Sequence, residues 1–330
     1  MTNKQNITRR TALGGSAALA AAAFVPKTPA LAQGLDRIIM LNGTAPPEPA
    51  SHYFQFAEKN GFYKKHGVDY EFRAISGTAN ALRATVAGEV DICFIDAWTG
   101  LQAKDSGARV KVLSAFCPKL DYAIIGNKDI KSLKDLANRS VAIGIVGGST
   151  QSIPKIMAQK AGAQVDSIRW LSVGNNAARA QSLIAKRVDA TMVTSTYVAR
   201  LLSYDHLHLL ADAAQEQPDI IYTFEVARED VLAKKKKAME GFIAATREGI
   251  RWALANPDKA AEIAVATVPD LPHEETATAI RNYVKRNFWE PSGRLPPKSL
   301  SATAALMLES GQIKAPVAYD DFVATEFTKV

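Results

Sequence analysis

The stretch Val141–Ser152, VAIGIVGGSTQS, decides the fold prediction. Its first six residues, up to Val146, are small or β-branched and do not alternate with polar ones. This pattern is typical of a strand buried on both faces of a parallel sheet. Two glycines, the second of them Gly148, permit a tight turn, and a helical pattern follows. We expect Ser149 or Thr150 to cap that helix, which leaves backbone N–H groups at its positive end for an anionic or strongly polar small molecule. An ordinary strand–turn–helix joint is an equally good interpretation.

The chain contains this unit in two halves of similar layout. The Val-Asp pairs that end at Asp91 and Asp189 lie 98 positions apart, and each precedes a short apolar strand and a polar turn. Gly77 and Gly174 occupy matching turns upstream, at an offset of 97. Alternating strands and helices predict mainly parallel sheets. The sequence therefore predicts an α/β protein of two related lobes, each a mostly parallel sheet flanked by helices.

The chain is expected to cross between the two lobes twice. Residues 36–126 and 225–330 are assigned to lobe 1, and residues 127–224 to lobe 2. The chain would pass between the lobes near Gly126 and again at residues 222–225, so that two strands form a hinge. One continuous sheet through both halves would contradict this prediction.

Residues 1–32 have the features of a cleaved signal peptide. Thr8-Arg9-Arg10-Thr11 precedes an alanine-rich apolar run that is too short to span a membrane, and Ala30-Leu31-Ala32 fits a cleavage site. The paired arginines indicate the twin-arginine export route. The sequence therefore predicts a periplasmic protein that is cleaved near Ala32.

Composition limits the partners and cofactors. The chain has 330 residues, 47% of them hydrophobic, which suits about two domains. Without the four basic residues of the leader the formal net charge falls from +7 to +3, so the basic balance is poor evidence for nucleic acid. Export permits a disulfide between Cys93 and Cys117, and this point stays open. His206 and His208 share one strand face without further ligands, so neither a metal site nor a cofactor is predicted.

The candidate ligand-binding residues follow from the expected topology. Ligands of parallel sheets gather beyond the carboxyl ends of the strands, and two facing lobes would form a cleft lined by helix starts, hydroxyl groups and aromatic rings. The candidates are Thr44, His52, Gly77, Thr78, Asp96, Trp98, Gly148, Ser149, Thr150, Asn175, Ser195, Thr196 and Tyr197. No Ser/His/Asp order and no pair of carboxylates placed for hydrolysis occurs, so the chain is not predicted to be an enzyme.

Two segments carry a family resemblance: FAEKNGFYKKHGVDYEF at 56–72 and GTANALRATVAGEVDICFIDA at 77–97. With them, most of residues 36–260 resembles the nitrate/sulfonate/taurine group of periplasmic solute-binding proteins. This group is similar to the thiamine-pyrimidine synthases. The resemblance implies a type II periplasmic-binding-protein fold that closes on a ligand and delivers it to the permease and ATPase subunits of an ABC importer. By position, the family's cleft corresponds to Thr44, Gly77, Thr78, Asp96, Ser149, Thr150 and Ser195.

The first loop departs from the family's pattern, because Ala45–Pro49 is rich in proline and contains Glu48. Together with Asp96, this acid weakens the case for a simple inorganic anion, since like charges near the ligand reduce its affinity. We expect a small organic anion of the sulfonate or carboxylate type, captured by hinge closure of a monomer. Its anionic group would bind near Ser149 and Thr150, with a donor group towards Asp96. The body of the ligand would stack on Trp98 or Tyr197.

Three alternatives stay open. The ligand would instead be a thiamine-type pyrimidine or another heteroaromatic molecule. The chain would be an enzyme of the thiamine-pyrimidine synthase type, although the cysteine-rich iron motif of those enzymes is missing here. A sensor would share all the cleft residues with an importer subunit, and only its partners would distinguish it.

Overall fold

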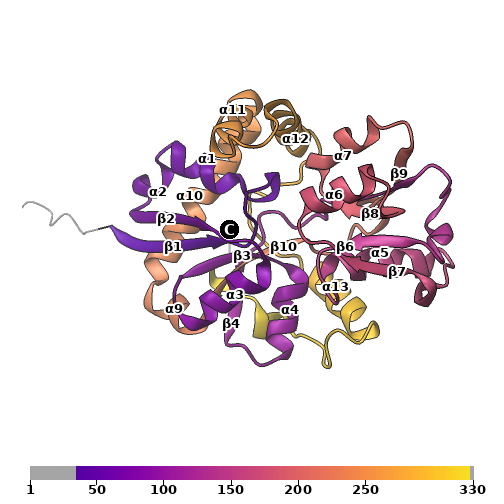
Figure 1. Cartoon of the computed structure of the whole chain (residues 1–330). Coiled ribbons are helices and arrows are strands. Elements are labelled where there is room, and N and C mark those ends of the chain that lie inside the picture. Colours follow the sequence, from indigo (N-terminus) through magenta and orange to yellow (C-terminus); the bar gives the residue numbers. More distant parts are fainter. Residues whose placement is uncertain (1–34, 328–330) are drawn as a thin grey trace, which may run out of the picture. The chain divides into compact units, whose positions relative to one another are not determined.

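The computed structural model describes residues 35–327, and these residues contain two separate five-stranded sheets (Figure 1). The predicted signal peptide and its cleavage site lie outside the described residues. Within the described residues, none of the helices combines the length and the apolar character that crossing a membrane requires.

The first sheet has the strand order β2-β1-β3-β10-β4. Its strands are β1 (Asp36–Asn42), β2 (Val68–Ala74), β3 (Ile92–Asp96), β4 (Val110–Ser114) and β10 (Thr223–Arg228). Strand β1 pairs in parallel with β2 and β3, whereas β10 runs antiparallel to both of its neighbours. We call this sheet and the helices packed on it the first lobe.

The second sheet repeats this arrangement in the order β7-β6-β8-β5-β9. Its strands are β5 (Ala123–Asn127), β6 (Ser140–Ile143), β7 (Arg169–Ser172), β8 (Ala190–Val193) and β9 (Leu207–Asp212). Strand β6 pairs in parallel with β7 and β8, and β5 is the antiparallel strand. Strands β6, β7, β8 and β9 thus match β1, β2, β3 and β4 one by one, which confirms the predicted pair of similar halves. We call this sheet with its helices the second lobe.

The antiparallel strand of each sheet is the strand that arrives from the other sheet. The chain leaves the first sheet after Ser114 and enters the second with β5, so β5 belongs to the second sheet, whereas the sequence analysis placed residues up to 126 in the first lobe. The difference arises at Gly126, which is not a linker glycine. A Cβ there would lie 2.6 Å from a methyl carbon of Leu210, so the glycine permits close packing within the sheet. The two crossing segments lie side by side, because Tyr222 N donates to Pro118 O at 2.8 Å.

Strand β6 is shorter than predicted. All four of its residues are buried, and Val141 and Ala142 belong to different hydrophobic clusters, which confirms that both faces of the strand are covered. The strand ends at Ile143 instead of Val146. Ile145 and Val146 are 63% and 72% exposed, because the chain already turns there and Gly144 N donates to the Thr150 hydroxyl at 2.8 Å.

The helices follow the strands as the sequence predicts, with one interruption. They are α1 (Tyr53–Lys59), α2 (Phe62–Lys65), α3 (Thr78–Ala87), α4 (Ala97–Asp105), α5 (Ser149–Lys160), α6 (Asn176–Ile184), α7 (Ser195–Leu202), α8 (Ala213–Glu216), α9 (Glu229–Lys234), α10 (Lys236–Ala255), α11 (Pro257–Thr267), α12 (His273–Lys285), α13 (Pro297–Glu309) and α14 (Tyr319–Phe322). Short 3-10 turns occur at η1 (Pro49–Ser51), η2 (Leu133–Leu136), η3 (Val165–Ser167) and η4 (Thr325–Phe327). Residues 53–65 form the two short helices α1 and α2 in place of one continuous helix, because Gly61 between them adopts a left-handed conformation with φ 73°.

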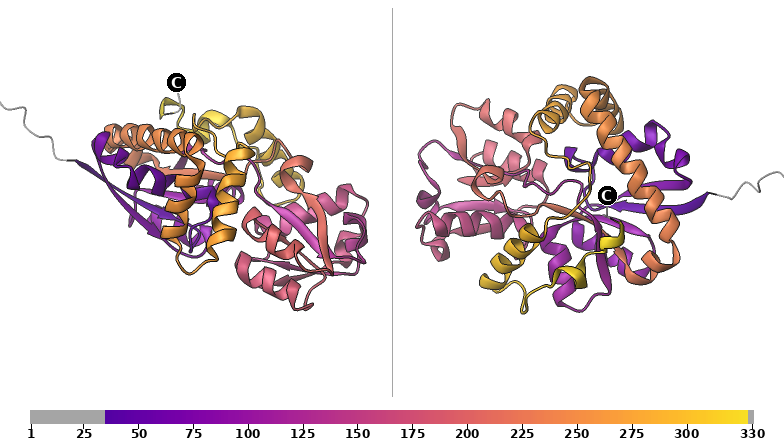
Figure 2. Two further views of the ribbon diagram at one scale, coloured as in Figure 1. Left: turned by 90° about the horizontal axis from the view of Figure 1, so that it is seen from above. Right: turned by 180° about the vertical axis from the view of Figure 1, so that it is seen from behind.

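The C-terminal helices contact both lobes. Figure 2 shows α10 lying alongside the first sheet, where it packs against α1, α2 and β1. Helix α12 contacts η1 of the first lobe and α7 of the second lobe. Arg286 and Gln312 extend these contacts, since they bind Asp212 of β9 at 2.7 Å and the Ser152 hydroxyl of α5 at 2.5 Å.

The repeated Val-Asp pair has the same structural role in both lobes. Asp91 Oδ2 accepts a hydrogen bond from Ile39 N at 2.9 Å, and Asp189 Oδ2 accepts one from Ser140 N at 2.8 Å. Each carboxylate therefore fixes a backbone amide of the leading strand, β1 or β6. Asp189 also accepts the Ser140 hydroxyl at 2.6 Å.

Replacing Asp189 with alanine is expected to lower the free energy of unfolding by about 2 kcal/mol, because it leaves a buried amide and hydroxyl without their charged acceptor. Urea unfolding followed by circular dichroism measures this. Asp129→Ala is the matched control, since Asp129 binds the same Arg139 at 2.7 Å but is a 58% exposed side chain. Its effect should stay within about 0.5 kcal/mol. Equal effects of the two substitutions would contradict the proposed role of Asp189.

Candidate functional site

In each lobe, two loops follow the carboxyl ends of the innermost parallel strands of the sheet. In the first lobe they begin after β1, at Gly43, and after β3, at Asp96. In the second lobe they begin after β6, at Gly144, and after β8, at Thr194. Ligands of open α/β sheets bind beyond these strand ends. Polar side chains of the two lobes also make direct contact here.

Glu48, in the loop after β1, reaches the second lobe. Its Oε1 accepts a hydrogen bond from the Asn176 amide of α6 at 2.8 Å. The side-chain oxygen of Asn176, Oδ1, in turn accepts a hydrogen bond from Arg179 Nη2 at 2.5 Å. Burial raises the pKa of Glu48, while the interactions with Asn176, Thr194 and Arg179 oppose this effect. One polar chain therefore connects the two lobes between their strand ends.

Arg179 brings a buried positive charge to this site. It is 3% exposed, and it also donates to Met192 O at 3.1 Å and to Gly174 O at 2.5 Å. Among the described residues it forms no direct ion pair with a carboxylate. Burial lowers its pKa, and nearby acidic groups, Tyr122 and Glu48 first among them, only partly offset this. A buried guanidinium without a direct ion pair attracts an anion.

The two crossing segments contribute a pair of tyrosines. The rings of Tyr122 and Tyr222 meet edge to face with centroids 5.0 Å apart. Burial raises the pKa of Tyr122; Asp96 and Glu48 raise it further, while Arg179 and Ser149 lower it. The Tyr122 hydroxyl is therefore influenced by both lobes at once, as expected of a group in the interlobe site.

Helix α5 begins without a side-chain cap. Its N-cap residue is Gly148, so the prediction that Ser149 or Thr150 caps the helix is wrong. The helix already begins at Ser149, so neither hydroxyl residue occupies the N-cap position. The Thr150 hydroxyl accepts a hydrogen bond from Gly144 N instead. The Ser149 and Thr150 amides at the start of α5 have no acceptor in a preceding turn of the helix, whereas Gln151 N donates to Gly148 O at 3.1 Å. A negatively charged group is stabilised at such a helix end.

Thr78 and Asp96 come together as predicted, but they bind each other. Asp96 caps α4 by accepting from Thr99 N at 3.0 Å, and the Thr78 hydroxyl donates to Asp96 Oδ2 at 2.5 Å. Gly77 begins the neighbouring helix α3 with φ 100°, and its amide donates to Gly43 O at 3.0 Å. These contacts hold the two first-lobe loops in a fixed relation.

Ser195 is held by a buried acid that the sequence analysis did not consider. Its amide and hydroxyl donate to the Asp121 carboxylate at 3.3 and 3.1 Å, and the Tyr283 hydroxyl of α12 donates to the same group. Burial raises the pKa of Asp121 to about 7, although Tyr283 and Ser195 oppose it. Asp121 thus joins a crossing segment, α7 and α12.

Three other predicted residues are enclosed beside the first loop and α7. His52 is 1% exposed, and burial lowers its pKa to about 4, so its ring is neutral near pH 7. Neither ring nitrogen has a partner among the described residues. The buried hydroxyl groups of Thr44 and Thr196 have none either. Unpartnered buried polar atoms are rare and require explanation.

The aromatic and amide candidates differ in access. Trp98 is 1% exposed and lies in a large hydrophobic cluster formed mainly by the first lobe, so the expectation that a ligand stacks on it is not supported. Tyr197 is 7% exposed, and burial, with a contribution from Glu48, raises its pKa to about 12. Asn175 is exposed and caps α6 by accepting from Ala178 N at 2.9 Å.

The sequence analysis missed Asn176, Arg179, Asp121, Tyr122 and Tyr222 as site residues. Arg179 did carry a signal, because a basic residue in the first turn of a helix opposes the helix dipole and requires compensation nearby. The other four have no such signal, since their relevance depends on how the two lobes meet.

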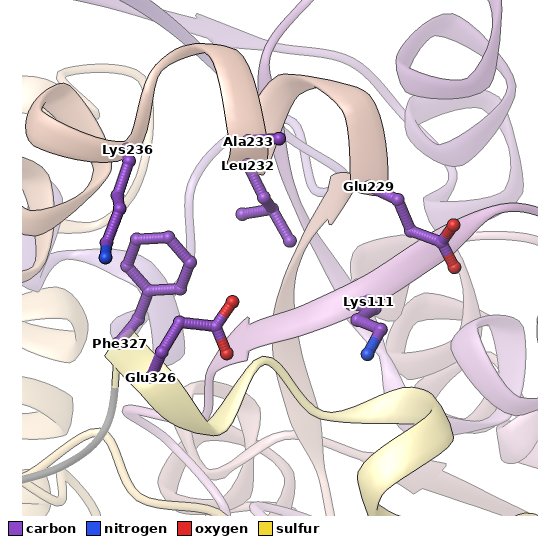
Figure 3. Close-up of a pocket in the computed structure, with 7 residues that line it drawn as sticks. All are labelled: Lys111, Glu229, Leu232, Ala233, Lys236, Glu326 and Phe327. Atoms are coloured by element: carbon purple, nitrogen blue, oxygen red, sulfur yellow. The ribbon is translucent and has the colours of Figure 1, made fainter.

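Two surface pockets of about 280 Å³ lie elsewhere on the first lobe. One is lined by Lys111, Glu229, Leu232, Ala233, Lys236, Glu326 and Phe327 (Figure 3). The other is lined by Asp36, Arg37, Lys234, Lys235, Lys237 and Ala238. Asp36 begins β1, and β10 ends beside the start of β4 at Val110, so both pockets lie at the amino-terminal edge of the parallel strands. This edge is opposite the candidate site.

Metal and thiol chemistry receive no support from the described part of the chain. There, no group of three or more His, Cys, Asp or Glu side chains is arranged to hold a metal ion. Cys93 and Cys117 are both buried and free, which answers the open question of a disulfide in this structure.

A family model described as NMT1/THI5 like matches residues 49–260. A binding protein of Brucella abortus (strain 2308), whose name states no ligand, is 22% identical over 211 residues. The match covers 63% of this chain and spans 64% of the length of that relative.

Solved structures extend the similarity over most of the chain. The periplasmic aliphatic sulphonate binding protein SsuA from Escherichia coli superposes with a TM-score of 0.72 at 16% identity, covering 89% of this chain and 99% of its own. The periplasmic nitrate-binding protein NrtA from Synechocystis PCC 6803 gives 0.61 at 14% identity, covering 73% and 69%. These likenesses, with the two matched sheets, confirm the predicted periplasmic-binding-protein fold.

Proposed function

Because the chain belongs to the NMT1/THI5-like family, we propose that it is the solute-binding subunit of an ABC importer and captures a small organic anion between its lobes. The ligand would be of the sulfonate or carboxylate type. The protein would act in the periplasm as a monomer and deliver its ligand to a permease and an ATPase. SsuA and NrtA, to which the fold is similar, are themselves described as periplasmic binding proteins.

The single observation that carries this proposal is the polar chain from Glu48 through Asn176 to Arg179. It spans the two lobes, and it ends at a buried guanidinium without a direct ion pair. Lobes joined by two crossing segments can open and close as rigid bodies. A ligand bound at this point would contact both lobes and so favour the closed form.

The ligand's anionic group would bind between the start of α5 and Arg179. The first-turn amides, the Ser149 hydroxyl and the Tyr122 hydroxyl supply neutral donors, and Arg179 supplies the charge. Ser149, Arg179 and Glu48 all lie close enough to Tyr122 to affect its pKa. Asp96, already bound to Thr78 and Thr99, would orient the site but accept little from the ligand.

Removing one hydroxyl tests this arrangement. Tyr122→Phe is expected to weaken binding about tenfold, since it removes one hydrogen bond to a charged group and keeps the ring. The ligand is first sought by native mass spectrometry of protein purified without denaturation, and then among alkanesulfonates and short carboxylates by thermal shift. Titration calorimetry compares the variants. Tyr204→Phe, in the second lobe beside His206, is the control and should bind like the wild type.

The combined variant Ser149→Ala and Thr150→Ala should also bind more weakly. Wild-type affinity in this variant and in Tyr122→Phe would contradict the assigned site. The absence of any stabilising sulfonate or carboxylate would contradict the proposed ligand class.

A second candidate function is the binding of a heteroaromatic molecule of the thiamine-pyrimidine type. The neutral, unpartnered ring of His52 and the carboxyl of Glu48 favour it, because a pyrimidine with an amino group both donates and accepts hydrogen bonds. An aminopyrimidine that stabilises the protein while sulfonates do not would select this candidate. Conversion of that compound without a transporter would instead indicate an enzyme.

A further inference from the structure

The negative charge of Glu48 affects titratable groups all around the interlobe site. Its charge acts on the pKa of five groups that come from separate parts of the chain. These are Asp121 and Tyr122 of the first crossing segment, Arg179 of α6, Tyr197 of α7 and Tyr222 of the second crossing segment.

The three carboxyl groups of this region have different partners. Asp96 is satisfied within the first lobe by Thr78 and Thr99, and Asp121 is satisfied by Ser195 and Tyr283. Glu48 alone among them is bound by the Asn176 amide that also binds Arg179. Glu48 is therefore the internal counter-charge of Arg179.

An anionic ligand brings a second negative charge to a site where Glu48 is already linked to Arg179 through Asn176, without a direct ion pair. Two negative groups beside one buried cation are unfavourable, and a carboxyl group relieves such a conflict by taking up a proton. Protonated Glu48 keeps one oxygen as acceptor for Asn176 and gains an O–H that donates to the ligand.

We propose, on the premise that the lobes capture an organic anion as set out above, that Glu48 takes up one proton from solvent when the ligand binds. The protein then captures its anion together with a proton. The O–H bond at Glu48 forms as the bond to hydrogen breaks in the proton donor, which is hydronium or the acid form of the buffer. The ligand class is thereby narrowed to anions that accept a hydrogen bond from a neutral carboxyl group beside Arg179.

The groups that face Glu48 are consistent with this role. Burial raises the pKa of Glu48 before any ligand is present, in the direction that proton uptake requires. His52 is neutral near pH 7, because burial lowers its pKa to about 4. The tyrosines stay protonated, since burial raises the pKa values of Tyr122, Tyr197 and Tyr222. Asp121 is the one rival for the proton, with a pKa of about 7.

Titration calorimetry in buffers of different ionisation enthalpy counts the protons taken up. The probes are ethanesulfonate and butyrate, at several pH values between about 5 and 8. For the wild type we expect one proton per ligand and an affinity that falls by up to about tenfold per pH unit as the pH rises. Glu48→Gln resembles the protonated form, so it should take up no proton, lose the pH dependence, and bind at least about tenfold more tightly than the wild type near pH 8.

Asp121→Asn separates the two carboxyl groups and should keep the proton uptake of the wild type. Wild-type binding without proton uptake overturns the inference, whether or not the variants fold. Uptake that persists in Glu48→Gln, or that disappears in Asp121→Asn, overturns it as well. In all these cases the proposed function stands. Failure of both probes to bind the wild type at any pH contradicts the proposed anion capture, and the inference falls with it.

Discussion

Replacing Gly249 with valine will lower the free energy of unfolding by about 3 kcal/mol. Gly249 lies in α10 where this helix crosses α1, and a Cβ there would come within 2.8 Å of both the Cβ and the backbone nitrogen of Ala57. Because the obstacle includes backbone, no side-chain rotation can relieve it. The two helices must separate, and the aromatic contact between Phe54 and Phe242, with centroids 6.0 Å apart, separates with them.

A smaller substitution at the same position gives a sharper test, because the two explanations predict opposite effects on stability. Helix propensity alone predicts that Gly249→Ala stabilises the protein by about 1 kcal/mol. The contact with Ala57 predicts destabilisation instead. Arg251→Val, at an exposed position two residues later, controls for the cost of valine in the helix. Urea unfolding of the three variants measures the effects, and a stabilised Gly249→Ala variant would contradict the close helix contact.

The stability of the protein will fall as the pH rises from about 5 to 7, through two buried carboxyl groups. Burial raises the pKa of Asp121 and of Glu225 to about 7. Glu225 is fully buried in β10, where the Tyr53 hydroxyl and Phe116 N donate to it. The folded state holds both protons more tightly than the unfolded chain does. Their contribution is therefore complete below the ordinary carboxyl pKa and is lost up to about pH 7, at about 1.4 kcal/mol per pH unit for each group.

Thermal and urea unfolding at several pH values measure this slope. The double variant Asp121→Asn and Glu225→Gln should reduce it strongly, because neither replacement titrates. Asp166→Asn is the control, since this side chain is 98% exposed and should leave the slope unchanged. A slope that is equal in the wild type and in the double variant would contradict the assignment.

Local patterns were sufficient to predict most of the fold. The unbroken apolar run at residues 141–146 predicted a strand covered on both faces, and the Val-Asp repeat predicted two similar sheets. The errors arose where a residue type that is typical of one structural role has a different role in this protein. Val146 belongs to the apolar run but is 72% exposed in the following turn. Gly126 resembles a linker glycine but packs against Leu210.

The candidate site was less predictable, because it depends on how the two lobes meet. Thr78 and Asp96 lie in one lobe, and the structure shows that their side chains bind each other, while their role towards a ligand stays a prediction. The bond between Glu48 and Asn176 joins residues 128 positions apart, and no local pattern announces it. Trp98 lies only two residues after Asp96, yet it shares a helix face with Leu101 and is buried with it. That spacing of three was a signal for the core.

The place of β10 between β3 and β4 determines the order in which a nascent chain can complete its sheets. All strands of the second sheet lie between residues 123 and 212, so they can pair as soon as they have left the ribosome. The first sheet, although synthesised earlier, keeps two unjoined edges until Arg228 has emerged. Contacts between distant segments form late. We therefore expect the second lobe to fold before the first lobe, although the first lobe begins earlier in the chain.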